Sequence, residues 1–284
     1  MAKTDCAVPP DRPWSLKKLQ PLRPVAVQLM RLVSSEECSL GRISSLIRAD
    51  VAFSVEVLRI ANSPLFGLRG KVDDVAHALP LLGLDRVKSL VVTVALRNFL
   101  SSTPADSTQR RCWRHSIACA CACDELAVAA GKDKEVVYTA GLLHDIGRLG
   151  LLAGNPAEYT RMLDVEEECG YDLLQSERDL FDVDHCQAGV WLVREWALPV
   201  EFETIAGQHH AAMAIDGFDN LKIVQLGCRI SDTLGFAVIP HADATLEDIL
   251  EKLPTSVVGK LGPIDDLAFR IGEQTAKLER DLLL

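Results

Sequence analysis

The sequence predicts an all-α protein in which an N-terminal helical bundle packs on a second helical bundle, with a short helical extension at the C-terminus. Three observations predict this class. The chain has 284 residues, of which only 5% are aromatic, and Leu, Ala and Val dominate, which favours helices. Two-residue hairpin signals are scarce. Apolar residues recur at intervals of three and four in both halves, which is the period of an amphipathic helix.

The N-terminal part is expected to contain an irregular lead-in over residues 1–17 and a helical subdomain over residues 18–100. Helical periodicity runs through "VAVQLMRLV", "SLGRISSLIRA", "VAFSVEVLRIA", "DDVAHALPLLG" and "RVKSLVVTVALRNFL". Ser39 and Asp50 are the predicted N-caps of the second and third of these helices, and Asp85 is that of the last.

The segment "SSTPADSTQR" (101–110) has no periodicity and is predicted to be a linker to a second helical subdomain over residues 111–236. Within the second subdomain, residues 138–152 are predicted to form one continuous helix, with His144 on its buried side and Asp145 on its flank. Helices are expected at 111–130, 135–153, 156–169, 184–196, 200–213 and 221–235.

The last part of the chain, residues 237–284, is predicted to be a helical extension. "TLEDILEKL" carries a capping box from Thr245 to Asp248, and a final helix starts near Pro263. Both have apolar faces that need cover, so we expect them to pack on the core or on a second subunit of a homodimer.

Charge and hydropathy limit the function classes. The net charge of −10 disfavours nucleic acid as a partner, because phosphate backbones attract basic proteins. Residues 1–100 alone carry 14 Lys and Arg against 9 Asp and Glu, which keeps a nucleic-acid-binding regulator as a minor hypothesis. No apolar run reaches the roughly 18 residues of a membrane span, and no signal peptide is recognisable, so we expect a cytoplasmic protein without membrane attachment.

The nine cysteines are not expected to form a disulfide framework, because their number is odd and no secretion signal is present. The cluster "CACAC" contains Cys119, Cys121 and Cys123. It could bind a metal, or it could supply small core residues to a helix. Their spacing differs from the CxxC of zinc sites. Small core residues in a tightly packed helix are the favoured interpretation.

A recurring anomaly marks the second subdomain. Five expected helices each direct a His or Asp toward the interior, because these residues share helical stripes with apolar residues. They are His115, His144 with the adjacent Asp145, His185, His209 with the adjacent His210, and Asp232. Buried polar groups need partners, and two alternatives would supply them. Imidazole and carboxylate ligands suit a divalent transition metal such as Fe, Mn, Co or Zn, whereas a hydrogen-bonded core would satisfy them without an ion.

The motif "GLLHDIGRL", with His115 upstream and Asp232 downstream, resembles the H…HD…D signature of HD-superfamily metal-dependent phosphohydrolases. A closer resemblance is to the HDOD domain, a relative of these enzymes in bacterial signalling proteins. "SLIRADVAFSVEVLRIANSPLFGL", "LGLDRVKSLVVTVALRNF", "GLLHDIG" and "HCQAGVWLVREWALP" followed by "HH" carry it. The resemblance covers roughly residues 18–215. The resemblance implies an HD-like fold for the second subdomain.

The resemblance also implies a metal centre with one or two ions. His115, His144, Asp145 and Asp232 would hold the first ion. His185, His209 and His210, which resemble the extended ligand set of the HD-GYP branch, would hold the second, with Asp145 bridging. In an enzyme, Asp145 and Arg148 would be the catalytic residues, because two cations generate a hydroxide and stabilise an in-line phosphoryl displacement.

Three departures argue against the cyclic di-GMP hydrolysis of the HD-GYP branch. Arg148 stands where a phosphate-binding lysine usually follows the HD pair, and its planar fork differs from a point charge. The GYP element is absent, since "HHAAMAIDGFDN" follows the histidine pair. Arg111 replaces an acidic residue four positions before His115, and a cation directed at a metal site would weaken it.

Two main functions therefore remain. The first is a stand-alone bacterial HDOD signalling or regulatory protein, with a protein partner or a small phosphate-containing ligand, because no receiver, kinase or cyclase domain fits into the remaining residues. The second is a metal-dependent phosphohydrolase of a nucleotide or another phosphate ester.

Overall fold

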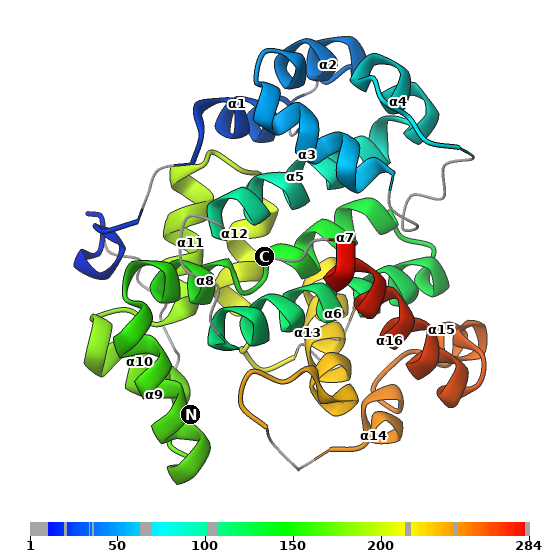
Figure 1. The fold of residues 1–284 in the computed structure, drawn as a ribbon. Helices are drawn as coiled ribbons and strands as arrows, with labels where there is room; N and C mark the ends of the chain where they lie inside the picture. Colours follow the sequence, from blue (N-terminus) through cyan, green and yellow to red (C-terminus); the bar gives the residue numbers. More distant parts are fainter. Residues whose placement is uncertain are drawn as a thin grey trace.

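The computed structural model describes residues 11–19, 22–33, 35, 37–62, 70–100, 107–213, 217–240 and 244–281. Within these ranges the protein is built from helices and contains no strand, which confirms the predicted all-α class. Figure 1 shows the helices in chain order from the N-terminal bundle at the top, through a central group, to a C-terminal group on the side of the central one.

The N-terminal bundle places the buried faces of its helices around Leu29, Ile43, Phe53 and Leu90. Two predicted caps are present: Ser39 accepts a hydrogen bond from the amide of Arg42, and Asp50 from that of Phe53. Asp85 lies inside the first turn of its helix rather than at the cap, because that helix begins one residue earlier. The helices are α1 (Pro24–Val33), α2 (Leu40–Arg48), α3 (Val51–Ala61), α4 (Val75–Leu82) and α5 (Leu84–Leu100).

The central group surrounds one long helix, α6 (Ser107–Ala130), of which most residues are buried. The predicted linker therefore overlaps the first turn of α6 at residues 107–110, and its residues 101–106 lie outside the described chain. The other members are α7 (Lys134–Leu143), α8 (Ile146–Gly154), α9 (Pro156–Cys169), α10 (Leu173–Phe181), α11 (His185–Glu195), α12 (Val200–Gln208), α13 (Asn220–Ser231) and η2 (Asp232–Phe236).

The expected continuous helix over 138–152 is broken between Leu143 and Ile146. Asp145 has φ −101° and ψ 21°, outside the α-helical range. The break redirects the chain, so that α8 packs against α11 at a very short distance. A Cβ atom on Gly147 would lie only 1.9 Å from the carbonyl oxygen of His185. The prediction of one helix was therefore wrong at the position of His144 and Asp145.

The cysteine cluster of α6 packs the core. Cys119, Cys121 and Cys123 are all buried, and none of them belongs to a described group that could hold a metal. The sulfur of Cys123 is the nearest contact for a Cβ on either Gly141 or Gly227, at 2.8 and 2.7 Å. The Cys123 thiol therefore fills the narrow interfaces of α6 with α7 and α13.

Two segments outside the helical bundles are anchored to the central group. Part of the expected irregular lead-in forms a short 3₁₀ turn, η1 (Trp14–Leu16), and its Ser15 carbonyl accepts a hydrogen bond from the side chain of Asn155 at 2.8 Å. The C-terminal extension forms α14 (Leu246–Leu250), α15 (Thr255–Leu261) and α16 (Ile264–Asp281), and α16 runs along α6. The predicted capping box from Thr245 to Asp248 is present.

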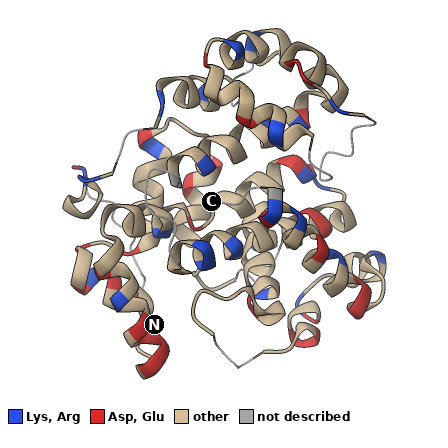
Figure 2. Ribbon diagram, in the orientation of Figure 1, with Lys and Arg blue, Asp and Glu red and all other residues tan. Residues whose placement is uncertain are grey.

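Lys and Arg segments are interspersed with Asp and Glu segments along the described helices (Figure 2). In the described part of the chain, no helix combines the length and the hydropathy that a membrane crossing requires.

Candidate metal centre

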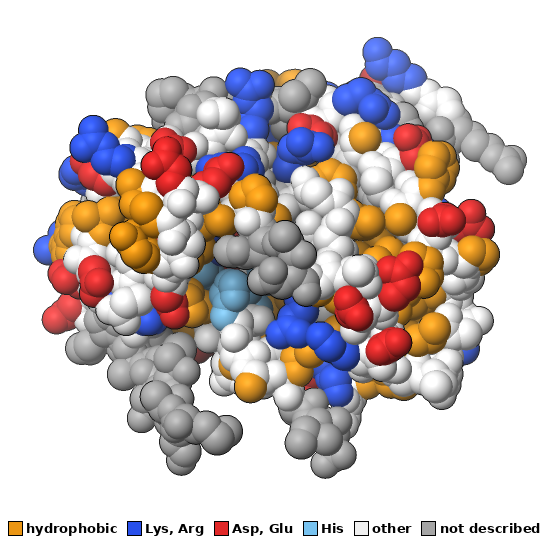
Figure 3. Space-filling view, turned by 90° about the horizontal axis from the view of Figure 1, so that it is seen from below, with side chains coloured by type: hydrophobic (Ala, Val, Ile, Leu, Met, Phe, Trp, Pro, Cys, Tyr) orange, Lys and Arg blue, Asp and Glu red, His pale blue; other side chains and the backbone are white. Residues whose placement is uncertain are grey.

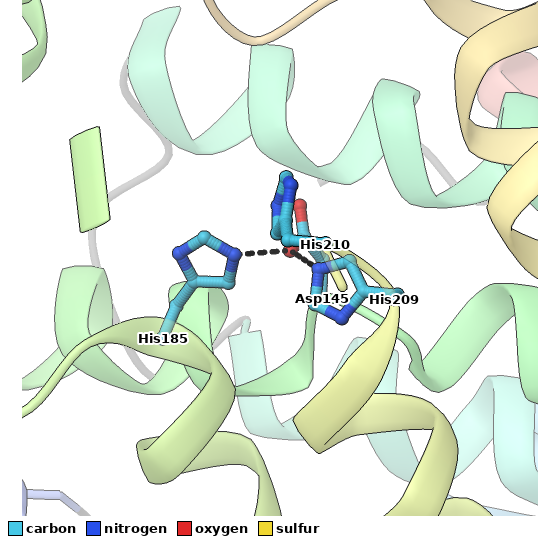
Figure 4. A group of neighbouring side chains, drawn as sticks. All are labelled: Asp145, His185, His209 and His210. Carbon is cyan, nitrogen blue, oxygen red and sulfur yellow. Dashed lines mark ion pairs between the residues drawn. The ribbon is translucent and has the colours of Figure 1, made fainter. Parts of the chain in front are cut away.

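The candidate centre is assembled mainly from helix ends. His144 follows the last residue of α7, Asp145 precedes α8, His185 is the first residue of α11, and His209 follows α12. His115 comes from the interior of α6. These five side chains are all buried, and Figure 4 shows His185 and His209 directed at Asp145 from two sides.

Four of the histidine rings form the same kind of hydrogen bond through Nδ1. In each ring Nδ1 faces an acceptor that cannot donate a hydrogen, so Nδ1 carries the proton and Nε2 presents a lone pair. The acceptors are the Phe236 carbonyl for His115 (3.1 Å), the Gly141 carbonyl for His144 (2.7 Å), the Glu177 carboxylate for His185 (2.6 Å) and the Ala206 carbonyl for His209 (2.9 Å).

The four lone pairs converge on Asp145. Its Oδ1 lies 3.4 Å from Nε2 of His185 and 3.3 Å from Nε2 of His209. Its Oδ2 lies 3.8 and 3.9 Å from Nε2 of His115 and His144. Nε2 of His115 and Nε2 of His144 are themselves only 3.2 Å apart. Lone pairs that face one another and a carboxylate repel unless a cation lies among them.

Two groups of side chains in the described chain have their ligand atoms within 4.8 Å of one another. We call them the His144 group (His115, His144, Cys228) and the His185 group (Asp145, His185, His209, His210). Asp145 connects them, because each of its carboxylate oxygens faces the histidines of one group.

The residues present fit a metal ion. Ligand atoms about 2.0–2.3 Å from a tetrahedral ion lie roughly 3.3–3.6 Å apart. The spacing of Asp145 Oδ1 to His185 and His209 (3.4 and 3.3 Å) and of His115 to Cys228 (3.6 Å) falls in this range. Asp145 Oδ1 and His209 Nε2 also have no hydrogen-bond partner although both are buried. Imidazole, carboxylate and thiol together suit a divalent transition ion.

Two further charged residues complete the surroundings of the centre. Arg148 in the first turn of α8 donates from Nε to Asp145 Oδ2 at 2.6 Å. Glu177 on α10 is fully buried and accepts from the backbone amide of His185 at 2.7 Å and from its Nδ1. The hydroxyl of Tyr159 donates to the other oxygen of Glu177. Glu177 thus fixes the orientation of the His185 ring, as carboxylates do for metal-binding histidines.

Burial and neighbouring charges set the protonation states of Asp145, His144 and His209. Burial would raise the pKa of Asp145, but the charge of Arg148 and the neighbouring histidines hold that pKa well below its usual range. Burial lowers the pKa of His144 and of His209, with partial compensation by Asp145. Asp145 is therefore ionised and both rings are neutral at neutral pH, which are the forms that bind metals.

The sequence analysis placed Asp232 in the first metal site, and the structure places it elsewhere. Its Oδ1 lies 3.4 Å from Nδ1 of His115, on the side of the ring that faces away from His144. Cys228, one turn earlier on α13, instead faces Nε2 of His115. Burial raises the pKa of the Cys228 thiol well above its ordinary value, and Asp232 adds to this increase. A metal at this position would displace the thiol proton.

Two other residues named in the sequence analysis, Arg111 and His210, lie at the edge of the centre or outside it. Arg111 does not point into the centre, because it forms an ion pair with Glu167 of α9 at 2.7 Å. His210 belongs to the His185 group but is exposed, unlike its other members. Figure 3 views the face opposite the N-terminal bundle and shows imidazole surface inside a hollow.

Sequence reasoning missed Cys228 and Glu177. Cys228 lies four residues before Asp232 and therefore on the same side of α13. Glu177 lies on α10, a helix that was not predicted, although Asp172 caps it and hydrogen-bonds to the amide of Gln175. The cap residue was the available signal for that helix.

An all-helical fold with an HD pair and converging histidines defines an HD-type protein. The sequence matches the HDOD domain over residues 19–212, so the chain belongs to the HDOD domain family. It is also 25% identical over 186 residues to an uncharacterized protein of Treponema pallidum (strain Nichols), with 65% of this chain and 36% of that protein covered. The chain therefore spans about a third of the length of that relative.

Solved structures share the fold. An HDOD domain protein of unknown function from Geobacter sulfurreducens has a TM-score of 0.77 and 21% identity, with 94% of each chain covered. A candidate phosphohydrolase from Shewanella amazonensis SB2B has a TM-score of 0.69 and 22% identity, with 95% of this chain and 99% of that chain covered. A candidate signal transduction protein from Marinobacter aquaeolei VT8 has a TM-score of 0.65 and 22% identity, with 98% and 61% covered.

Proposed function

We propose that this HDOD protein is a cytoplasmic regulatory component of bacterial signal transduction whose HD centre binds a divalent transition metal. One observation carries the metal proposal: four buried imidazole lone pairs converge on one ionised carboxylate, with Asp145 Oδ1 and His209 Nε2 left without partners. The family and the candidate signal transduction protein of similar fold support the regulatory role. The partner is a signalling protein or a small phosphate-containing ligand.

The protein's own residues would do three things at a bound metal, which would supply Lewis acidity. His115, His144, His185, His209 and His210 would offer ring nitrogens. Asp145 would place one carboxylate oxygen beside each group. Glu177 would hold the His185 ring in position through its Nδ1 hydrogen.

The metal is tested by elemental analysis and thermal unfolding of the full chain purified without added metal. We expect Fe, Mn, Co or Zn in the wild type and less in His144→Ala. An ion at a thousandfold excess over its Kd stabilises the fold by about 4 kcal/mol, so a chelator should lower the melting temperature of the wild type but not that of His144→Ala. His77→Ala, a change at an exposed histidine of α4, should behave as the wild type. No metal and equal chelator effects in all three proteins would leave a metal-free polar core.

The alternative function, a metal-dependent phosphohydrolase, has one observation in its favour. Two ligand groups share Asp145, which is the arrangement of a two-metal centre. In that case Asp145 would bridge the ions and Arg148 would bind the phosphate. A screen with bis-(p-nitrophenyl) phosphate and nucleotides under Mn²⁺, Co²⁺ or Zn²⁺ tests it. Turnover that is lost in Asp145→Asn would support the enzyme, and absence of turnover by the metal-loaded protein would support the regulatory role.

A further inference from the structure

Arg148 is a buried cation inside the candidate centre. Its side chain is 4% exposed, and its Nε lies 2.6 Å from Asp145 Oδ2. Its Nη2 lies 3.4 Å from Nε2 of His185. Because Nδ1 of His185 donates to Glu177, Nε2 of that ring has only a lone pair and accepts the hydrogen of Arg148.

This contact competes directly with a metal. The single lone pair on Nε2 of His185 binds either an N–H hydrogen or an ion, and here it faces the guanidinium. The same guanidinium neutralises Asp145, which is the one carboxylate within the two described groups. Without His185, the His185 group keeps one carboxylate oxygen, the ring of His209 and the exposed ring of His210. A divalent ion there would also lie next to a fixed positive charge.

The His144 group has no such competitor. Nε2 of His115 faces Nε2 of His144 at 3.2 Å and the sulfur of Cys228 at 3.6 Å. These spacings are close to the roughly 3.3–3.6 Å expected between ligands of one tetrahedral ion. In the described chain, no Lys or Arg forms a hydrogen bond or an ion pair with any of these three side chains. Two imidazoles and a thiolate form a donor set that suits Zn²⁺ or Co²⁺.

We propose that the guanidinium of Arg148 takes the place of a second cation, so that the centre holds a single ion, bound by His115, His144 and Cys228. The inference rests on the metal centre proposed above. Arg148 thereby sets the number of ions, and Cys228 rather than Asp232 is the third protein ligand. A two-metal hydrolase holds two cations. In this one-ion centre, the metal ion is one of the two positive charges and the guanidinium of Arg148 is the other.

Titration of the metal-free full chain with Co²⁺ tests the proposal, because a thiolate bound to Co²⁺ gives a charge-transfer band in the near ultraviolet. The wild type should bind one equivalent with this band, and Cys228→Ser should lose the band. Arg148→Met should bind two equivalents, with no further growth of the band during the second. Arg148→Gln, which keeps a polar side chain, serves as the second variant should the first fail to fold.

Arg111→Met is the matched control, since Arg111 is paired with Glu167 outside the centre, and it should keep one equivalent. Two equivalents in the wild type, or one equivalent in a folded Arg148 variant, would overturn the role of Arg148. Retention of the band in Cys228→Ser would overturn the assignment of Cys228. Absence of any Co²⁺ binding by the wild type would instead refute the metal centre itself.

Discussion

The buried histidines of the centre take up a second proton less readily in the folded chain than in the unfolded chain. Each of the four inner rings already uses its Nδ1 hydrogen, so a second proton would go to Nε2 in the interior of the centre. Burial opposes that charge and lowers the pKa of His144 well below its ordinary value, and that of His209 as well. In the unfolded chain the same rings titrate near pH 6.5.

This difference predicts the pH dependence of the metal-free protein. As the pH falls below about 6.5, the unfolded chain binds protons that the folded chain refuses, so the free energy of unfolding decreases. Each such histidine contributes a slope of up to about 1.4 kcal/mol per pH unit until its folded pKa is reached. Urea unfolding of chelator-treated protein between about pH 7.5 and pH 5.5 measures it.

Two glutamine variants make the test specific. His144→Gln should have a shallower dependence than the wild type, whereas His77→Gln, on the exposed side of α4, should have the same slope. An unchanged slope in His144→Gln would show that His144 titrates alike in the folded and unfolded chains.

At the residue scale, the sequence indicated which residue types gather in the interior but not which atoms face one another. His115, His144, Asp145, His185, His209 and His210 do lie together. Asp232 lies on the other side of the His115 ring, with its Oδ1 3.4 Å from Nδ1, and belongs to neither ligand group. A helical projection places Cys228 and Asp232 on the same side of α13, but it does not show which nitrogen of the His115 ring each of them faces.

The break between α7 and α8 shows the corresponding limit at the scale of elements. Hydrophobic periodicity continues through residues 138–152, because both helices bury the same kinds of side chain. This periodicity contains no information about the backbone angles of a single residue such as Asp145. The glycines were the better signal. Gly147 and Gly189 lie on facing positions of α8 and α11, and their missing side chains allow the two backbones to approach.

Gly147→Ala is predicted to destabilise the protein strongly. The new Cβ would lie 1.9 Å from the carbonyl oxygen of His185 and 2.3 Å from the amide nitrogen of Gly189. Both are backbone atoms, so α8 and α11 would have to separate. We expect a loss of about 3 kcal/mol or more in the free energy of unfolding, measured by urea unfolding.

Gly41→Ala is the matched control, because a Cβ at this position in α2 meets nothing within 4 Å. It should be neutral or stabilise the fold by up to about 1 kcal/mol. Equal stability of Gly147→Ala and the wild type would mean that the two helices are further apart in solution.

Helix α10 was missed for a physical reason. It is only nine residues long, and one of its buried positions holds the carboxylate of Glu177 instead of an apolar side chain. Hydrophobic periodicity treats such a position as exposed. The buried acid is explained only by partners from distant parts of the chain, namely Tyr159 and His185.

At the scale of the whole molecule, the extension is part of the core although it lies beyond the HDOD match. Leu267, Ile271 and Leu278 of α16 are buried, and Arg270 pairs with Glu125 of α6 at 2.8 Å. The sequence predicted that these helices need cover, because their apolar faces were evident. It could not distinguish the chain's own core from a second subunit, since both would cover the same face.

Removal of the chain after residue 240 should therefore destabilise the protein. Each buried Leu or Ile contributes about 1.5–3 kcal/mol, so we expect a decrease in melting temperature of at least about 10 °C, with reduced solubility. Two substitutions on α16 refine the test. Leu267→Ala should cost about 2–4 kcal/mol, whereas Phe269→Ala, whose side chain is 70% exposed, should change stability by less than about 0.5 kcal/mol. Unchanged melting after truncation would contradict the packing of α16 on α6.

The origin of the ligands at helix ends has a mechanical consequence. His144, Asp145, His185 and His209 each lie at the joint between a rigid helix and a turn, so their mutual spacing reports how α7, α8, α11 and α12 are placed. Bonds to a metal tolerate changes of only about 0.2 Å, and a small rotation of one helix would exceed that. A partner that prefers one placement of these helices therefore changes the affinity for the ion, and by reciprocity the ion changes the affinity for the partner by the same factor. For a metal-bound centre, occupancy by the ion and attachment of a partner would both depend on the same placement of these helices.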